Sequence, residues 1–190
     1  MNRVVELVFQ IVCNKNRKFI SMKVAGYEIE NKINPNNVDL FLNGVAIRSK
    51  FFIQTYIIAL YAAKPIQQEN IAIESNIERS LRMLIITPLA TSKAVSENIK
   101  NGMKEGLGNL YMQQKDLVDD LRKVIETSNV QFKDSIDIYY TSDKELKLYK
   151  NNQEIYSNKN GQLFAETIFG MYVGKKPKDK KIKESLLKGF

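Results

Sequence analysis

The sequence predicts an α+β fold in which a large antiparallel sheet is covered by helices on one side. Short runs of β-branched and aromatic residues come first, two amphipathic helical patterns follow, and three short strand patterns and two helices close the chain. This order does not alternate strictly between strand and helix, which argues against a parallel doubly wound sheet. With 190 residues, 44% of them hydrophobic, the chain can build one sizeable core, so a single domain is expected.

The first half of the chain is typical of strands. Residues 23–33 alternate around a Gly and residues 38–42 are apolar except for Asp39, with a polar turn containing Pro35 between them, so two antiparallel strands are expected. Residues 51–63, FFIQTYIIALYAA, are rich in Phe, Tyr, Ile and Thr, which favours a central strand buried on both faces.

Two more elements lead up to Pro88. A short helix is expected within residues 66–75. Residues 77–86 predict a further strand, because apolar side chains recur there at every second position, at Ile77, Leu81, Met83 and Ile85.

After Pro88 the apolar period changes from two residues to three or four, which predicts an amphipathic helix. Its apolar positions are Val95, Ile99, Met103, Leu107 and Leu110. A second helix is predicted by Leu117, Val118, Leu121, Val124 and Ile125. Short strands follow as a predicted meander at residues 136–140, 146–149 and 154–156. Helices at residues 164–173 and 182–187 end the chain, with a break at Gly174 and Pro177.

The composition excludes several kinds of site. The chain has no His, which removes the usual general base near neutral pH and most transition-metal sites. Its single cysteine, Cys13, cannot form an internal disulfide. It also has no glycine-rich phosphate loop, no Gly-x-Ser-x-Gly elbow and no Cys cluster with metal-ligand spacing, so no metal and no cofactor are expected.

The net charge of +8 favours an acidic partner, whether nucleic acid, anionic lipid or a carboxylate ligand. Much of the excess lies in residues 174–190, where seven Lys face only Asp179 and Glu184. A Lys run without stacking aromatics is a weak nucleic-acid signal, so we expect a solvated helix end there and no nucleic-acid partner. Peripheral contact with an anionic membrane stays open.

The N-terminus reads as a segment of its own, residues 1–21, ahead of a single domain at residues 22–190. Residues 4–13, VVELVFQIVC, are apolar but interrupted by Glu6, and no small-x-small cleavage site follows. The segment is therefore interpreted as a helix or a degenerate signal, and the location of the protein is left open between cytoplasm and periplasm. No apolar run is long enough to cross a bilayer.

Three segments in order carry a family resemblance. Residues 42–65, LNGVAIRSKFFIQTYIIALYAAKP, resemble the first core motif of the chalcone isomerase-like family, particularly its short bacterial branch. Residues 86–107 are similar to the family's strand-to-helix junction and the helix after it, and residues 165–187 resemble its C-terminal helix, Gly, Pro and final helix. The resemblance implies an open-faced β-sandwich: a large antiparallel sheet with helices layered on one face and a ligand cleft between them.

The resemblance also implies site residues. In the plant enzymes an Arg after the Gly-rich turn stabilises the phenolate of a chalcone that closes its own ring without a cofactor, and Arg48 matches that position. The catalytic Tyr of those enzymes appears here as Thr91, which argues against an active chalcone isomerase. Tyr56 matches the family's fatty-acid-binding members, which pair an Arg with a Tyr to hold a carboxylate. Asn98 and Thr167 resemble further substrate-contacting positions.

These implications lead to one main hypothesis and two alternatives. The main one is a non-catalytic protein that binds a fatty acid or similar amphipathic carboxylate, with Arg48 and Tyr56 at the head group. The first alternative is a cofactor-free intramolecular lyase acting on a chalcone or another enone, with Arg48 as oxyanion stabiliser. The second is a basic surface protein that meets anionic lipid or nucleic acid through its Lys-rich C-terminus. The oligomeric state is not predicted.

Overall fold

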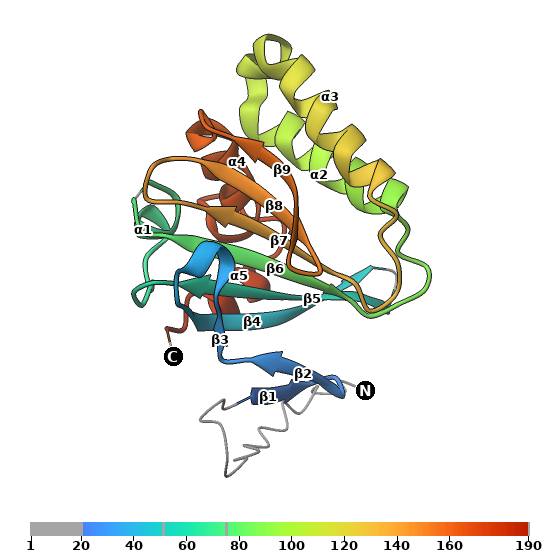
Figure 1. Ribbon diagram of the computed structural model, residues 1–190, viewed down its shortest axis with the longest axis vertical. Helices are drawn as coiled ribbons and strands as arrows, with labels where there is room; N and C mark the ends of the chain where they lie inside the picture. The colour runs from blue at the N-terminus through green and yellow to red at the C-terminus, as the bar shows by residue number, and fades with distance from the viewer. Residues whose placement is uncertain (1–20, 51, 75, 190) are drawn as a thin grey trace.

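The computed structural model describes residues 21–50, 52–74 and 76–189, apart from the side chain of residue 50 (Figure 1). The expected N-terminal segment, residues 1–21, falls outside this part except for Ser21. None of the helices described has the length and apolar character needed to cross a bilayer.

The described chain forms a seven-stranded antiparallel sheet in the order β3-β4-β5-β6-β7-β8-β9, together with a separate β1-β2 hairpin. Within the seven-stranded sheet, strands consecutive in the chain are neighbours, connected by turns or by helical segments. The strands are β1 (Ser21–Val24), β2 (Tyr27–Glu30), β3 (Lys32–Ile33), β4 (Leu40–Lys50), β5 (Ile53–Ala62), β6 (Arg79–Ile85), β7 (Ser135–Tyr140), β8 (Leu146–Lys150) and β9 (Gln153–Asn158).

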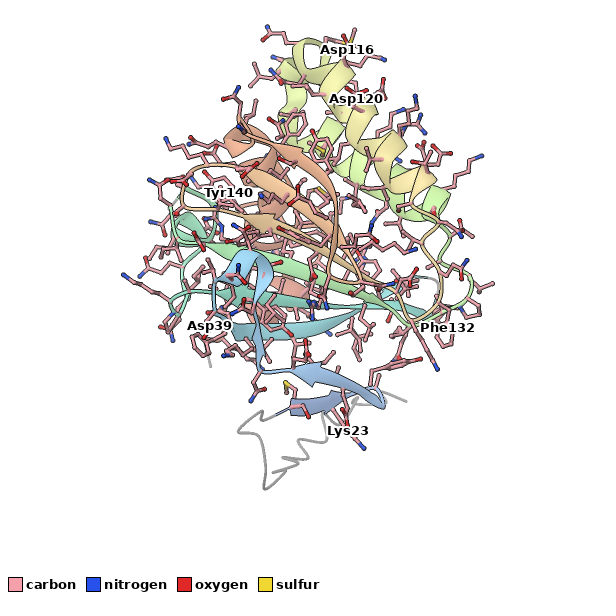
Figure 2. All side chains as sticks on the ribbon, in the orientation of Figure 1. Lys23, Asp39, Asp116, Asp120, Phe132 and Tyr140 are labelled. Carbon is pink, nitrogen blue, oxygen red and sulfur yellow. The ribbon has the colours of Figure 1, made fainter. Side chains whose placement is uncertain are left out.

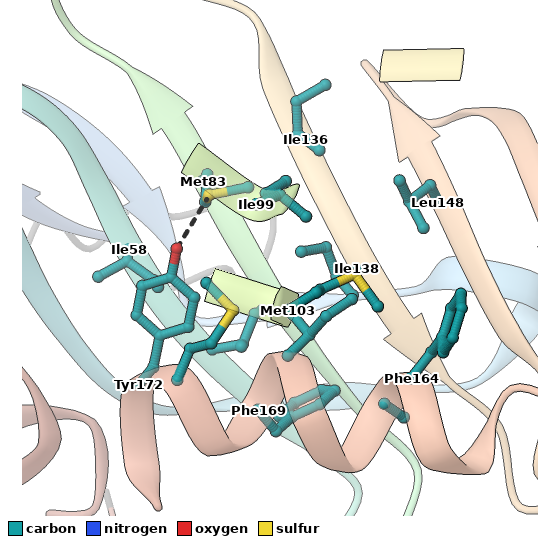
Figure 3. Close-up of a cluster of buried hydrophobic side chains, with 14 of the residues drawn as sticks. Ile58, Met83, Ile99, Met103, Ile136, Ile138, Leu148, Phe164, Phe169 and Tyr172 are labelled. Atoms are coloured by element: carbon teal, nitrogen blue, oxygen red, sulfur yellow. Dashed lines mark hydrogen bonds between the residues drawn. The ribbon is translucent and has the colours of Figure 1, made fainter. Parts of the chain in front are cut away.

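Helices cover one face of this sheet. They are α1 (Glu69–Glu74), α2 (Ser92–Leu107), α3 (Tyr111–Thr127), α4 (Gln162–Val173) and α5 (Lys180–Leu186), with short 3-10 turns η1 (Pro35–Asn37) and η2 (Gly108–Leu110). Their apolar faces meet side chains of the sheet in one large core, part of which Figure 3 shows. Met83 of β6 and Ile138 of β7 lie in this core with Ile99 and Met103 of α2 and Phe169 of α4. The α+β fold with helices on one side is therefore confirmed.

The other face of the sheet is covered by the β1-β2 hairpin, which Figure 1 shows on the side away from α2 and α3. Val24 and Ile29 of the hairpin pack with Ile57 and Tyr61 of β5 in a second, smaller core. Because both faces of β5 are covered, residues 56–62 are all buried, as the apolar run predicts.

Two strand boundaries differ from the sequence prediction. Residues 23–33 contain a turn at Ala25 and Gly26, both with positive φ, so they form the end of β1, β2 and β3 instead of one strand. The strand expected at residues 38–42 continues to residue 50 as β4. Pairing with β5, which extends from Phe41 to Lys50, stabilises this longer strand.

Helix α5 is fixed on β4 by Asn43, a buried polar residue. The Asn43 side-chain amide donates 2.7 Å hydrogen bonds to the carbonyls of Ile66 and Leu186, and its oxygen accepts from the Ile66 backbone N–H at 2.6 Å. At the next position a Cβ on Gly44 would lie 2.2 Å from the Ser185 carbonyl oxygen. Only glycine lets the helix backbone approach this closely, so Asn43 and Gly44 together set the position of α5.

We predict that Asn43→Ala lowers the free energy of unfolding by roughly 2–4 kcal/mol, since three hydrogen bonds are lost and buried backbone groups are left unpaired. Chemical denaturation measures the change. Asn101→Ala, on the exposed side of α2, is the control and should change stability little. Equal effects in the two variants would show that Asn43 does not hold α5.

Candidate functional site

A cavity of about 460 Å³ lies between the sheet and the N-terminal half of α2. Its apolar wall is formed by Ile53, Met83, Ile85, Leu89, Ala90, Ala94, Val95 and Ile99. Its polar groups are Arg48, Thr55, Tyr56, Asn98 and Lys178. A small adjoining hollow shares Arg48, Tyr56, Asn98 and Lys178 and reaches Tyr172, Asp179 and Ile182. The pocket thus has a long apolar wall and a compact polar region beside α5.

The pairing of β4 with β5 places two of the polar side chains. Arg48 and Tyr56 are direct partners across the two strands, and the register shifts between Arg48 and Ser49. Directly paired residues project from the same face of a sheet, so both side chains reach the pocket that they line. Tyr56 is buried, whereas the Arg48 side chain keeps 28% of its surface exposed.

The two phenols of the site share one hydrogen bond. The hydroxyls of Tyr56 and Tyr172 lie 3.2 Å apart, and the Tyr172 hydroxyl also points at the Met83 sulfur, 3.8 Å away (Figure 3). Burial raises the pKa of both phenols, although the Arg48 charge opposes the rise. Both therefore stay neutral near pH 7. When Tyr172 is the donor of the shared bond, the Tyr56 hydroxyl can donate a hydrogen bond to an anion.

Lys178 is the second cation of the site. Its ammonium donates to the Asn98 carbonyl at 3.4 Å and lies over Gly102, where a Cβ would be 2.9 Å from its nitrogen. Burial of the amine and the nearby Arg48 charge lower the pKa of Lys178, while Glu105 opposes the change. Two cations held near each other repel, and an anionic ligand beside them would offset this repulsion.

Asp179 provides the negative charge closest to Arg48. Its carboxylate lies 3.5 Å from the Arg48 guanidinium and also caps α5 by accepting from the backbone N–H groups of Lys181 and Ile182. Among the residues that line the pocket and the adjoining hollow, two positive charges therefore face one negative charge. This charge balance favours a ligand with a single anionic group at the end of an apolar chain.

The structure brings three of the predicted site residues together and leaves two elsewhere. Arg48, Tyr56 and Asn98 line the same pocket. Thr91 is the exposed N-cap of α2, where its hydroxyl accepts from the Ala94 N–H at 3.3 Å. Thr167 donates to the Leu163 carbonyl within α4 at 2.7 Å and faces Gly106 of α2. Neither Thr is among the residues that line the pocket.

Sequence reasoning missed Lys178, Tyr172 and Asp179. Lys178 belongs to a stretch expected to be solvated, and charge pattern alone does not show which lysine of a run turns inward. A signal was available for Tyr172, because a phenol in the apolar stretch 164–173 needs a buried hydrogen-bond partner. Asp179 could have been found as a capping residue directly before a short helix.

The arrangement can hold an amphipathic anion and has no evident metal centre. Across the described ranges, no three or more His, Cys, Asp or Glu side chains gather in a way that could hold a metal ion. Charge-assisted hydrogen bonds from Arg48 and Lys178 suit a carboxylate head, and the apolar wall suits a hydrocarbon tail.

Comparisons with known proteins agree with this fold. The model of the chalcone isomerase-like family matches residues 21–188. A fatty-acid binding protein of Arabidopsis thaliana has a similar solved structure, with a TM-score of 0.70 and 18% sequence identity over 88% of this chain and 96% of that chain. Comparison with curated proteins gives no significant match. Because the family match spans nearly all of the described chain, this protein belongs to the chalcone isomerase-like family.

Proposed function

We propose that this protein binds a fatty acid or a similar amphipathic carboxylate in the pocket between the sheet and α2, without catalysing a reaction on it. The observation that carries the proposal is the division of the pocket: two cations and a neutral phenol lie together in a cavity whose remaining lining is mostly apolar. Its volume of about 460 Å³ is within the range of small-molecule sites. The similar Arabidopsis protein is itself a fatty-acid binding protein, which supports the same class of ligand.

The head group would be held by Arg48, Tyr56 and Lys178. A guanidinium keeps its charge at every working pH and presents donors in a planar fork, so Arg48 suits a carboxylate. Each hydrogen bond to a charged group contributes about 1.5–3 kcal/mol. The tail adds about 0.8 kcal/mol for each buried CH₂ group, so affinity should rise with chain length until the pocket is full.

The ring-closing alternative has no observation of its own in its favour. Thr91, at the position of the plant enzymes' catalytic Tyr, is an exposed helix cap and supplies no phenol to the pocket. The basic-surface alternative also loses part of its support. Lys178 lies at the pocket, and Lys183 is engaged with Glu69 and with the Gly174 carbonyl.

The main experiment is native mass spectrometry of freshly purified protein, followed by extraction and identification of bound lipid. We expect a stoichiometric fatty acid in the wild type and its absence from Arg48→Ala, because loss of a charged hydrogen bond weakens affinity by about 10- to 100-fold. Arg122→Ala is a matched control: Arg122 has the same 28% exposed side chain but lies on α3 with Glu126 as a partner. It should keep the lipid.

Two results would contradict the proposal. One is a wild-type protein that carries no lipid and does not bind added long-chain fatty acid in a fluorescence displacement assay. The other is equal loss of lipid from Arg48→Ala and Arg122→Ala. Circular dichroism of each variant checks that the fold is intact.

Affinity should also depend on pH through Lys178. The pKa of Lys178 lies below its ordinary value of 10.5, so its charge is lost at a lower pH than that of a surface lysine. An anion favours the protonated amine, and binding should therefore weaken as the pH rises through the alkaline range below 10.5. Lys178→Met should bind about fivefold more weakly near neutral pH and lose this decrease. Lys159→Met, in the turn after β9, should retain both the neutral affinity and the decrease.

Asp179→Asn is expected to strengthen binding. Asp179 competes with the ligand for Arg48, whereas Asn caps a helix about as well as Asp does. Removing one charge should raise fatty-acid affinity about two- to fivefold with little change in the free energy of unfolding. Asp143→Asn, in the turn between β7 and β8, is the control and should leave affinity unchanged. Weaker binding by Asp179→Asn would mean that Asp179 orients Arg48 for the ligand instead of competing with it.

A further inference from the structure

Three connections of the chain meet at one end of the sheet, beside the pocket. They are the β4-β5 turn, the β6-α2 connection and the α3-β7 connection, which Figure 1 shows at its right-hand side. Backbone bonds join them: the Ile86 N–H donates to the Thr55 carbonyl at 3.2 Å, and the Lys133 N–H donates to the Ile85 carbonyl at 2.9 Å. The Val130 N–H also donates to the Ser92 hydroxyl.

Each connection exposes a large apolar side chain. Phe52 is fully exposed, Leu89 is 68% exposed and Phe132, labelled at the lower right in Figure 2, is 41% exposed. Ile53, 43% exposed, and Leu89 also line the pocket. Single exposed apolar residues need no explanation, but a group of them continuous with a ligand pocket marks an interaction site. We call Phe52, Ile53, Leu89 and Phe132 the apolar rim.

Phe52 is unfavourable for the isolated protein in two ways. Its backbone has a φ of 65°, a conformation that favours Gly and Asn and is an outlier for a bulky residue. Its ring is at the same time fully exposed to solvent. A strained turn that presents an aromatic ring outward is expected where the ring has a binding role.

The charge of the rim is positive. Residues 52–56, 86–96 and 128–134 contain Lys93 and Lys133 and one acidic residue, Asp134, whose carboxylate lies 3.2 Å from the Lys150 ammonium. The Lys133 ammonium lies 5.4 Å from the centre of the Phe132 ring, so charge and apolar surface are adjacent. Apolar tips flanked by lysines are complementary to anionic head groups above a hydrocarbon layer.

We infer that the apolar rim docks on the surface of an anionic phospholipid bilayer, with Phe52, Leu89 and Phe132 entering the interface and Lys93 and Lys133 among the head groups. The three apolar side chains come from separate connections instead of one flat face, which suits a fluid bilayer better than a folded protein partner. In this orientation the pocket opens toward the membrane, so an amphipathic ligand would pass between bilayer and pocket without crossing water. The docking itself does not depend on the identity of that ligand.

The test is flotation of the purified protein with vesicles of phosphatidylcholine containing roughly 30 mol% phosphatidylserine. We expect the wild type to bind these vesicles and Phe52→Asn to bind at least about tenfold more weakly, because one large apolar side chain no longer enters the interface. Asn tolerates the positive φ, so this variant should be at least as stable to denaturation as the wild type. Phe132→Ser should weaken binding in the same direction.

A matched control lies at the far end of the α2-α3 pair. Met112 is 74% exposed near the start of α3, and Figure 1 shows this end of the pair remote from the β4-β5 turn. Met112→Ser should bind vesicles as the wild type does. If Met112→Ser weakens binding as much as Phe52→Asn, the inference is overturned.

The electrostatic part is tested separately. Lys93→Glu places a negative charge in the first turn of α2, where a helix favours it, and should weaken binding about fivefold. Added salt should weaken binding of the wild type, and vesicles of pure phosphatidylcholine should bind it less. Lys159→Glu, beyond the opposite end of the sheet, should have no effect. Equal binding to neutral and anionic vesicles, or no binding to either, would overturn the inference.

The inference and the proposed function can fail independently. Phe52 and Phe132 do not line the pocket, so Phe52→Asn should still bind a fluorescent fatty acid in solution as the wild type does. Arg48→Ala should lose the fatty acid and keep vesicle binding. Loss of vesicle binding in Arg48→Ala, with fatty-acid affinity retained, would contradict both assignments.

Discussion

The site depends on the close packing of the α5 backbone against β4. Gly44 permits the approach, and the three hydrogen bonds of Asn43 fix it by joining β4 to the end of α5 and to the backbone at Ile66. Because α5 begins after Asp179, this packing also places Asp179 beside Arg48 and Lys178 over α2. A binding site assembled from β4, β5, α2 and the chain before α5 thus rests on one glycine and one buried amide that do not touch the ligand pocket.

Two arginines on the helix side of the sheet have different roles: the charge of one is used within the fold, and the charge of the other can reach a ligand. Arg79 is fully buried between the rings of Tyr140 and Phe169 and donates to the carbonyls of Ile73 and Ile77. Burial lowers the pKa of Arg79 to about 10, so it remains charged at neutral pH with its hydrogen-bonding capacity directed at the fold. Among the described residues, Arg48 has Asp179 at 3.5 Å as its acceptor, and part of its side chain reaches the pocket. Arg48 is therefore the arginine that can still take a ligand.

Most helices and strands could be predicted from the sequence, because the spacing of apolar residues shows which face of an element is buried. The change of period after Pro88 located α2, and the β-branched and aromatic run at residues 51–63 located β5. Arg48, Tyr56 and Asn98 were proposed through the family resemblance, and the structure places them in one pocket. Lys178 could not be found in this way, since its inward direction depends on Gly102 and on the docking of α5, both tertiary features. The hairpin at residues 21–30 was missed because the Ala25-Gly26 turn leaves the alternation of apolar residues almost unbroken.

The end of the sheet beside the pocket combines several locally unfavourable features. At the end where β6 begins, even the charged Arg79 is enclosed by carbonyls and aromatic rings. At the end where β6 finishes, Phe52 has an unfavourable φ, large apolar side chains face solvent, and two like charges lie near each other. A chain selected for stability alone would place Asn or Gly at position 52 and polar residues at the tips of these connections. Binding would account for these features beside the pocket: in the two proposals, a membrane interface would cover the apolar tips, and the carboxylate of a ligand would offset the two cations.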